Sequence, residues 1–203
     1  MNIPHKLYHY SSDPIEELKQ NFHDRHRREF GLFQKPHGVW ISIEDFGEED
    51  SNWKSWCIAE GFNLEGLKYK YSISIREGAR ILYMSTIEEL DAFSLKYAGN
   101  DPSEFKRYSA HIDQRPYIYI IDWQSVMSEY DGIMIAPYRW DCRLLNPTTA
   151  WYYGWDCSSG CIWNMQAIKS FTLDSITDMG ELEVMAVEET QTDSLSASLG
   201  QLT

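Results

Sequence analysis

Short apolar or alternating stretches recur along the chain, separated by polar turns, and predict a series of β-strands. The stretch Tyr69–Ile75 (YKYSISI) alternates apolar and polar residues, which is typical of a strand with one buried face. We expect the other strands at Lys6–Ser11, Val39–Ile43, Arg80–Met84, Asp131–Tyr138, Gly160–Asn164 and Ala167–Leu173.

Helix signals lie between these strands. They predict helices at residues 15–28, 53–62, 87–99 and 122–130. Pro14, preceded by a capping Ser12 or Asp13, opens the first helix, and Thr86 caps the third. Because the elements show no regular βαβ rhythm and no Gly-rich phosphate loop, the pattern favours an α+β fold over a Rossmann sheet.

Length and charge predict one domain with a distinct tail. The chain has 203 residues, enough for one buried core, and we expect a single domain over residues 1–175. Residues 176–203 are rich in acids, Ser and Thr, and no Lys or Arg follows Lys169. We therefore expect this tail to be partly disordered.

The net charge of −13 argues against nonspecific nucleic-acid binding, which depends on cations neutralising phosphates. The basic run Arg25–Arg28 is expected to be a solvated helix end, the alternative being a phosphate contact. The longest apolar run, Tyr117–Ile121, is too short to span a bilayer, and the first residues lack an apolar signal core. We expect a cytoplasmic protein that does not enter membranes.

The four cysteines are expected to be thiols in that compartment. Cys157 and Cys161 are four residues apart, but Cys57 and Cys142 are distant and no histidine has a ligand spacing. A zinc site is therefore not expected, and we predict no metal cofactor.

Three stretches combine a predicted strand with unusual polar or aromatic residues. His9 lies in the aromatic strand "LYHYSS", and Trp40 follows Gly38 in "HGVWIS". The third stretch, Trp151–Asn164 (WYYGWDCSSGCIWN), places Asp156 among tryptophans, serines and glycines. Each feature alone has a structural explanation as a core residue or a turn carboxylate. Together they predict a ligand cleft, with Trp151–Asn164 as one wall.

These motifs resemble the ADP-ribosyltransferase superfamily, in its diphtheria-toxin-like and poly(ADP-ribose) polymerase-like branch. The matching text is "YHYSS", "GVWIS" and "WDCSSGCIWN", followed by "AIKS", over roughly residues 6 to 170. The resemblance implies an α+β fold with a split β-sandwich, flanking helices and a cleft for NAD. It also implies transfer of ADP-ribose from NAD to a macromolecular acceptor, with protein favoured over nucleic acid, as in toxins and phage or bacterial conflict proteins.

The resemblance also implies roles for individual residues. His9, expected to be a catalytic residue together with Asp156, would hydrogen-bond the adenosine-side ribose. The backbone of Tyr10 would hold the nicotinamide amide, and Trp40 would stack on the nicotinamide ring. Ser11 and Ser42, from the same two motifs, complete the NAD-binding residues expected on the first two strands. Catalysis needs a negative charge near the sugar cation that forms when the glycosidic bond breaks.

The third motif departs from the family pattern, because the position of the customary glutamate falls on Ser159. We expect Asp156, three residues earlier in a Ser- and Gly-rich turn, to supply the charge, with Ser159 binding NAD. This arrangement is similar to that of phage anti-CRISPR ADP-ribosyltransferases. The alternatives are an NAD glycohydrolase, which transfers to water, a phosphotransferase acting on 2′-phosphorylated RNA, and an inactive binding or immunity protein of the same fold.

Overall fold

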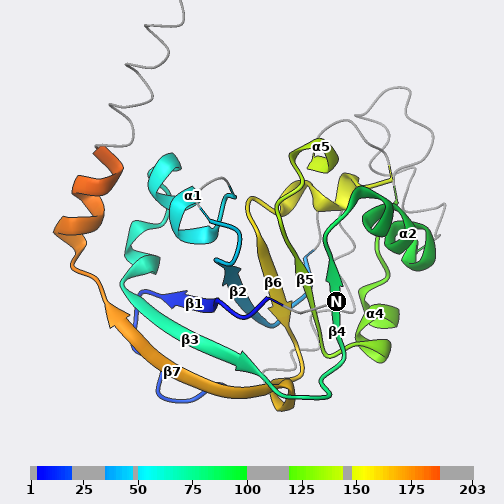
Figure 1. The fold of residues 1–203 in the computed structure, drawn as a ribbon, viewed down its shortest axis with the longest axis horizontal. Coiled ribbons are helices and arrows are strands. Elements are labelled where there is room, and N and C mark those ends of the chain that lie inside the picture. The colour runs from blue at the N-terminus through cyan, green and yellow to red at the C-terminus, as the bar shows by residue number, and fades with distance from the viewer. Residues whose placement is uncertain (1–3, 20–34, 48–49, 100–118, 144–147, 188–203) are drawn as a thin grey trace, which may run out of the picture.

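One open sheet of seven strands organises the fold (Figure 1). The computed structural model describes residues 4–19, 35–47, 50–99, 119–143 and 148–187. Its strands are hydrogen-bonded in the order β4-β5-β6-β2-β1-β3-β7. The pair β4 and β5 is parallel, and the other recorded strand pairs are antiparallel. Helices pack around this sheet, so the expected α+β class is confirmed.

Every predicted strand is present, with small shifts at the ends. The strands are β1 (Leu7–Ser11), β2 (Val39–Ile43), β3 (Tyr69–Ile75), β4 (Ile81–Met84), β5 (Gly132–Ile135), β6 (Ser159–Ile162) and β7 (Ile168–Ile176). The α-helices are α1 (Trp53–Glu60), α2 (Ile87–Tyr97), α4 (Trp123–Glu129) and α5 (Trp140–Arg143). Short 3₁₀ helices form at η2 (Leu64–Leu67), η3 (Ala150–Gly154) and η4 (Met165–Ala167).

Local sequence signals set one end of α1 and one end of α2. Thr86 caps α2: its hydroxyl accepts the N–H of Glu89 at 3.2 Å, and the Glu89 carboxylate accepts the N–H of Thr86 at 3.1 Å. Gly61 ends α1 in the left-handed region, at φ 58°, a conformation that glycine adopts without steric cost. The start of α2 and the end of α1 are therefore fixed by residues next to them in the sequence.

The helix predicted from Pro14 is wrong over its described part, because residues 14–19 are not helical. Tertiary contacts hold this stretch instead. The N–H of Ile15 donates to the hydroxyl of Tyr71 on β3 at 2.7 Å, and Leu18 packs against the core beside the sheet. Residues 20–28, which include the basic run Arg25–Arg28, lie outside the described residues.

The sheet changes direction along its length. In Figure 1 the strands β4, β5 and β6 run across the direction of β1, β3 and β7. One apolar core packs α2, α4 and η3 against β4, β5 and β6, and a second surrounds Leu7, Ile41 and Ile73. Ile133 of β5 belongs to the first core and the adjacent Met134 belongs to the second, so the two cores lie on opposite faces of this strand.

The aromatic stretch Trp151–Asn164 does not form a cleft wall over its full length. Trp151, Tyr152 and Trp155 are at most 1% exposed and belong to the larger core, and Trp151 Nε1 donates to Ser94 Oγ at 2.7 Å. The predicted wall is therefore wrong for the aromatic half of the stretch. Large rings buried among other rings stabilise the fold and leave no face for a ligand.

The predicted tail begins as structured chain. Strand β7 reaches Ile176, and residues 179–187 are helical. Leu182 from this segment is fully buried against Cys57 and Leu67. Residues 188–203 lie outside the described residues, so the disorder expected for the tail stays a prediction. No helix in the described ranges has the length and apolar character needed to cross a bilayer.

Candidate functional site

A pocket opens where β1 and β2 separate. The two strands pair at Leu7–Ile43 and Tyr8–Ser42, the pairs recorded between them. Beyond this point β1 continues along β3 and β2 continues along β6. The cavity at this divergence, which we call the split pocket, has a volume of about 280 Å³. The separation of β1 from β2 therefore forms the pocket.

The split pocket brings together six of the seven residues expected at the site. It is lined by Tyr8, His9, Tyr10, Lys35, Trp40, Ile41, Ser42, Trp53, Asn63, Asp156, Cys157 and Ser159. Ser11 is not among the lining residues that the structure describes, and its hydroxyl donates to the carbonyl of Asp13 at 2.7 Å. The imidazole, indole and carboxylate predicted to act together thus share one cavity.

His9 is held as a neutral hydrogen-bond acceptor. Its Nδ1 lies 2.7 Å from the carbonyl oxygen of Trp40, which can only accept, so Nδ1 carries the proton. Burial lowers the pKa of His9, although the hydrogen bond to Trp40 opposes the shift. The ring is therefore neutral at pH 7, and Nε2 keeps a lone pair that can accept a hydrogen bond from a hydroxyl.

Trp40 is fixed by a second indole from the core. The rings of Trp40 and Trp155 meet edge to face, with centroids 4.9 Å apart and planes at 64°. The ammonium of Lys35 lies 5.1 Å from the centroid of the Trp40 ring. Trp155 thus links the buried aromatic core to the pocket and orients the aromatic side chain that lines it.

Asp156 is surrounded by cations. Arg143 donates to its Oδ1 at 2.7 Å, and Lys35 Nζ lies 4.0 Å from Oδ2. One carboxylate and two cations leave a formal charge of +1 in the cluster around Asp156. Burial lowers the pKa of Lys35, and the Asp156 carboxylate opposes this shift. The arrangement fixes one carboxylate oxygen and favours an anionic group nearby.

Ser159, the first residue of β6, was expected from the sequence to bind NAD. It is directly opposite Ser42 in the β2–β6 pairing, and it is 7% exposed. Its hydroxyl donates to the carbonyl of Cys157 at 2.9 Å. Ser159 contributes a polar edge to the pocket and no charge.

No protein-family model, curated protein or solved structure matches this chain. The functional assignment of the pocket therefore depends on the geometry of its residues.

Sequence reasoning missed several residues of the pocket. Lys35 and Asn63 come from loops, and Trp53 is the first residue of α1. Trp53 reaches the pocket because Asn52 caps the helix and the Trp53 N–H donates to Ser42 Oγ at 3.1 Å. The capping residue Asn52 could have predicted where α1 starts. The position of α1 against β2 depends on the tertiary structure.

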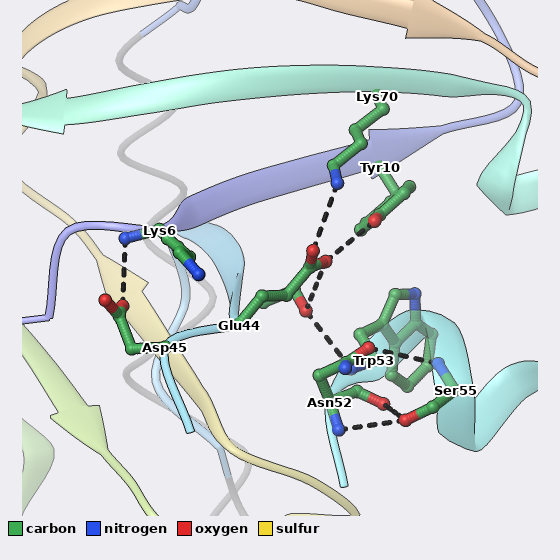
Figure 2. Close-up of polar contacts among 9 residues, drawn as sticks. Lys6, Tyr10, Glu44, Asp45, Asn52, Trp53, Ser55 and Lys70 are labelled. Atoms are coloured by element: carbon green, nitrogen blue, oxygen red, sulfur yellow. Dashed lines mark hydrogen bonds and ion pairs between the residues drawn. The ribbon is translucent and has the colours of Figure 1, made fainter. Parts of the chain in front are cut away.

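A second carboxylate, Glu44, contacts two residues that line the pocket and was also missed. Figure 2 shows Tyr10 and Lys70 pointing toward Glu44. The Tyr10 hydroxyl donates to Glu44 Oε1 at 2.8 Å, and Lys70 Nζ lies 3.0 Å from Oε2. Tyr10 and Ser42 line the pocket and contact Glu44, so this carboxylate connects to the site through their hydroxyls.

The cysteines are buried thiols. All four cysteines are free, as expected, and burial raises the pKa of Cys57 and of Cys157 to about 12. Such thiols stay protonated at neutral pH and are weak nucleophiles. Within the described part of the chain, no group of three His, Cys, Asp or Glu side chains is placed to hold a metal ion.

Proposed function

We propose that the protein is an NAD-dependent ADP-ribosyltransferase that modifies a macromolecular acceptor. The observation that carries the proposal is that His9, Trp40 and Asp156 line the same pocket. They come from β1, β2 and the turn before β6, in the order in which the family motifs occur. The divergence of β1 from β2 supports the finer part of the fold prediction, a split β-sandwich of the ADP-ribosyltransferase type.

The residues in and beside the pocket offer chemistry that suits the parts of NAD. Trp40 offers a flat face for the nicotinamide ring, and neutral His9 offers an acceptor for a ribose hydroxyl. Lys35, which lines the pocket, provides positive charge for a phosphate. The volume of about 280 Å³ is near the lower end for small-molecule sites, so one end of the dinucleotide would be enclosed and the rest would lie outside.

Asp156 is the carboxylate proposed to stabilise the sugar cation. Arg143 holds Oδ1, while Lys35 is at 4.0 Å from Oδ2, beyond hydrogen-bond distance. Oδ2 can therefore face the positive charge that develops on the ribose. A group that stabilises a charge present only in the transition state raises the rate of bond cleavage.

The alternative proposal is a protein of this fold that binds a ligand without turnover. Ser159, which replaces an acid, and the cations around Asp156 favour it. A glycohydrolase is the third proposal, in which water replaces the macromolecule as acceptor.

Incubation with labelled NAD separates these proposals. The transferase predicts nicotinamide release together with ADP-ribose label on a macromolecule in a cell lysate. A glycohydrolase releases nicotinamide and leaves macromolecules unlabelled. The binding protein releases none, and this last result would contradict both enzyme proposals.

A further inference from the structure

Glu44 ends a chain of hydrogen bonds that begins in the split pocket. It follows β2 and lies two residues after Ser42, so both side chains project from the same face of the sheet. The hydroxyls of Tyr10 and Ser42 lie 2.8 and 3.4 Å from the same carboxylate oxygen, Oε1. The side chain of Glu44 is 18% exposed, and that of Lys70, which binds Oε2, is 19% exposed.

The directions of these hydrogen bonds are fixed by their other partners. The N–H of Trp53 donates to Ser42 Oγ at 3.1 Å, so the Ser42 proton is left to point toward Glu44. Burial and the adjacent Glu44 raise the pKa of Tyr10, so its phenol stays protonated and donates to the carboxylate. The hydroxyls of two residues that line the pocket thus direct their protons to one acceptor.

We propose that Tyr10 and Glu44 form a proton relay that activates the acceptor of the ADP-ribosyl group, which rests on the proposed function. The acceptor O–H or N–H gives its proton to Tyr10 Oη as the Tyr10 proton moves to Glu44 Oε1. The acceptor lone pair forms a bond to ribose C1′, and the C1′–N bond breaks. Its electron pair stays on the nitrogen, and neutral nicotinamide leaves.

The relay gives the two carboxylates different roles: Asp156 stabilises the sugar cation, and Glu44 accepts the proton. Arg143 engages Oδ1 of Asp156 at 2.7 Å and fixes the carboxylate proposed to face the sugar cation. Glu44 has one cation, Lys70, on Oε2 and a transferable phenol proton on Oε1. A relay of this kind serves an acceptor that must lose a proton, such as an alcohol, an amide or water.

Glu44→Gln and Tyr10→Phe test the relay, with nicotinamide release from NAD as the assay and water as the acceptor. Each variant is expected to lower kcat about 100-fold, the scale of general-base catalysis. The NAD dissociation constant should stay within about twofold, since the glutamine keeps the shape of the side chain. The double variant should lose no more than either single variant, because both residues serve one proton transfer.

Asp45→Asn is the matched control, because Asp45 is the next residue and its carboxylate accepts the N–H groups of His5 and Lys6, outside the pocket. It should keep the wild-type kcat. Wild-type kcat in Glu44→Gln, or losses that multiply in the double variant, would overturn the relay while NAD cleavage by the wild type still supports the proposed function. Absence of both NAD binding and cleavage in the wild type would overturn the proposed function and the relay with it.

Discussion

Replacing Asp156 by asparagine is expected to lower kcat for NAD cleavage about 1,000-fold, which is the upper range for removing one electrostatic stabiliser from an active site. Asparagine keeps the size of the side chain and an oxygen for the 2.7 Å contact with Arg143. It removes the negative charge that the sugar cation requires. The loss should therefore appear in kcat and leave the dissociation constant for NAD little changed.

The matched control for this variant is Asp141→Asn. Asp141 also pairs with an arginine, since Arg139 donates to it at 3.1 Å, but it is half exposed and is not among the described pocket residues. Steady-state nicotinamide release should distinguish the two variants. Equal activity of Asp156→Asn and the wild type would contradict a catalytic role for Asp156 and favour a structural ion pair with Arg143.

Trp151→Ala is expected to lower the free energy of unfolding by about 4 kcal/mol, the scale for truncating a buried aromatic residue. Trp151 is 1% exposed, and its ring packs against Phe93 and Trp123 at centroid distances of 5.1 and 5.9 Å. The variant also removes the hydrogen bond to Ser94. Denaturant unfolding followed by circular dichroism measures the change.

Tyr153→Ala provides the comparison from the same stretch. Tyr153 is 44% exposed, and its ring centroid lies 5.3 Å from the Arg143 guanidinium, so the free energy of unfolding should fall by about 1 kcal/mol or less. A small loss for Trp151→Ala would contradict the assignment of this stretch to the core. If Trp151→Ala instead kept the wild-type free energy of unfolding but no longer bound NAD, the ring would belong to a ligand site, as the sequence first indicated.

The strands could be predicted because their signal is local. Tyr69–Ile75 alternates along its own length, and β3 has those same bounds. The prediction of a helix after Pro14 was wrong because it used only a local capping signal. The contact of Ile15 with Tyr71 joins residues far apart in the sequence and could not be seen in that signal. Local patterns therefore identified the elements whose tertiary contacts agree with them.

The candidate site was predictable only in part. His9, Trp40 and Asp156 were identifiable as unusual residues beside strands, and the pocket includes all three. Glu44 has no such signal, because its contact with Tyr10 arises from the way β2 ends beside β1. The partner of Asp156, Arg143, comes from a separate helix, so the charge around the carboxylate could not be derived from the turn alone.

The central claim is that His9, Trp40 and Asp156 form one site for NAD. Calorimetric titration of the full chain with NAD tests it most directly. The wild type should bind one NAD per chain, and Trp40→Ala should weaken binding at least about tenfold, the effect of losing one stacked ring. No binding heat at millimolar NAD, or equal affinity of Trp40→Ala and the wild type, would contradict the claim.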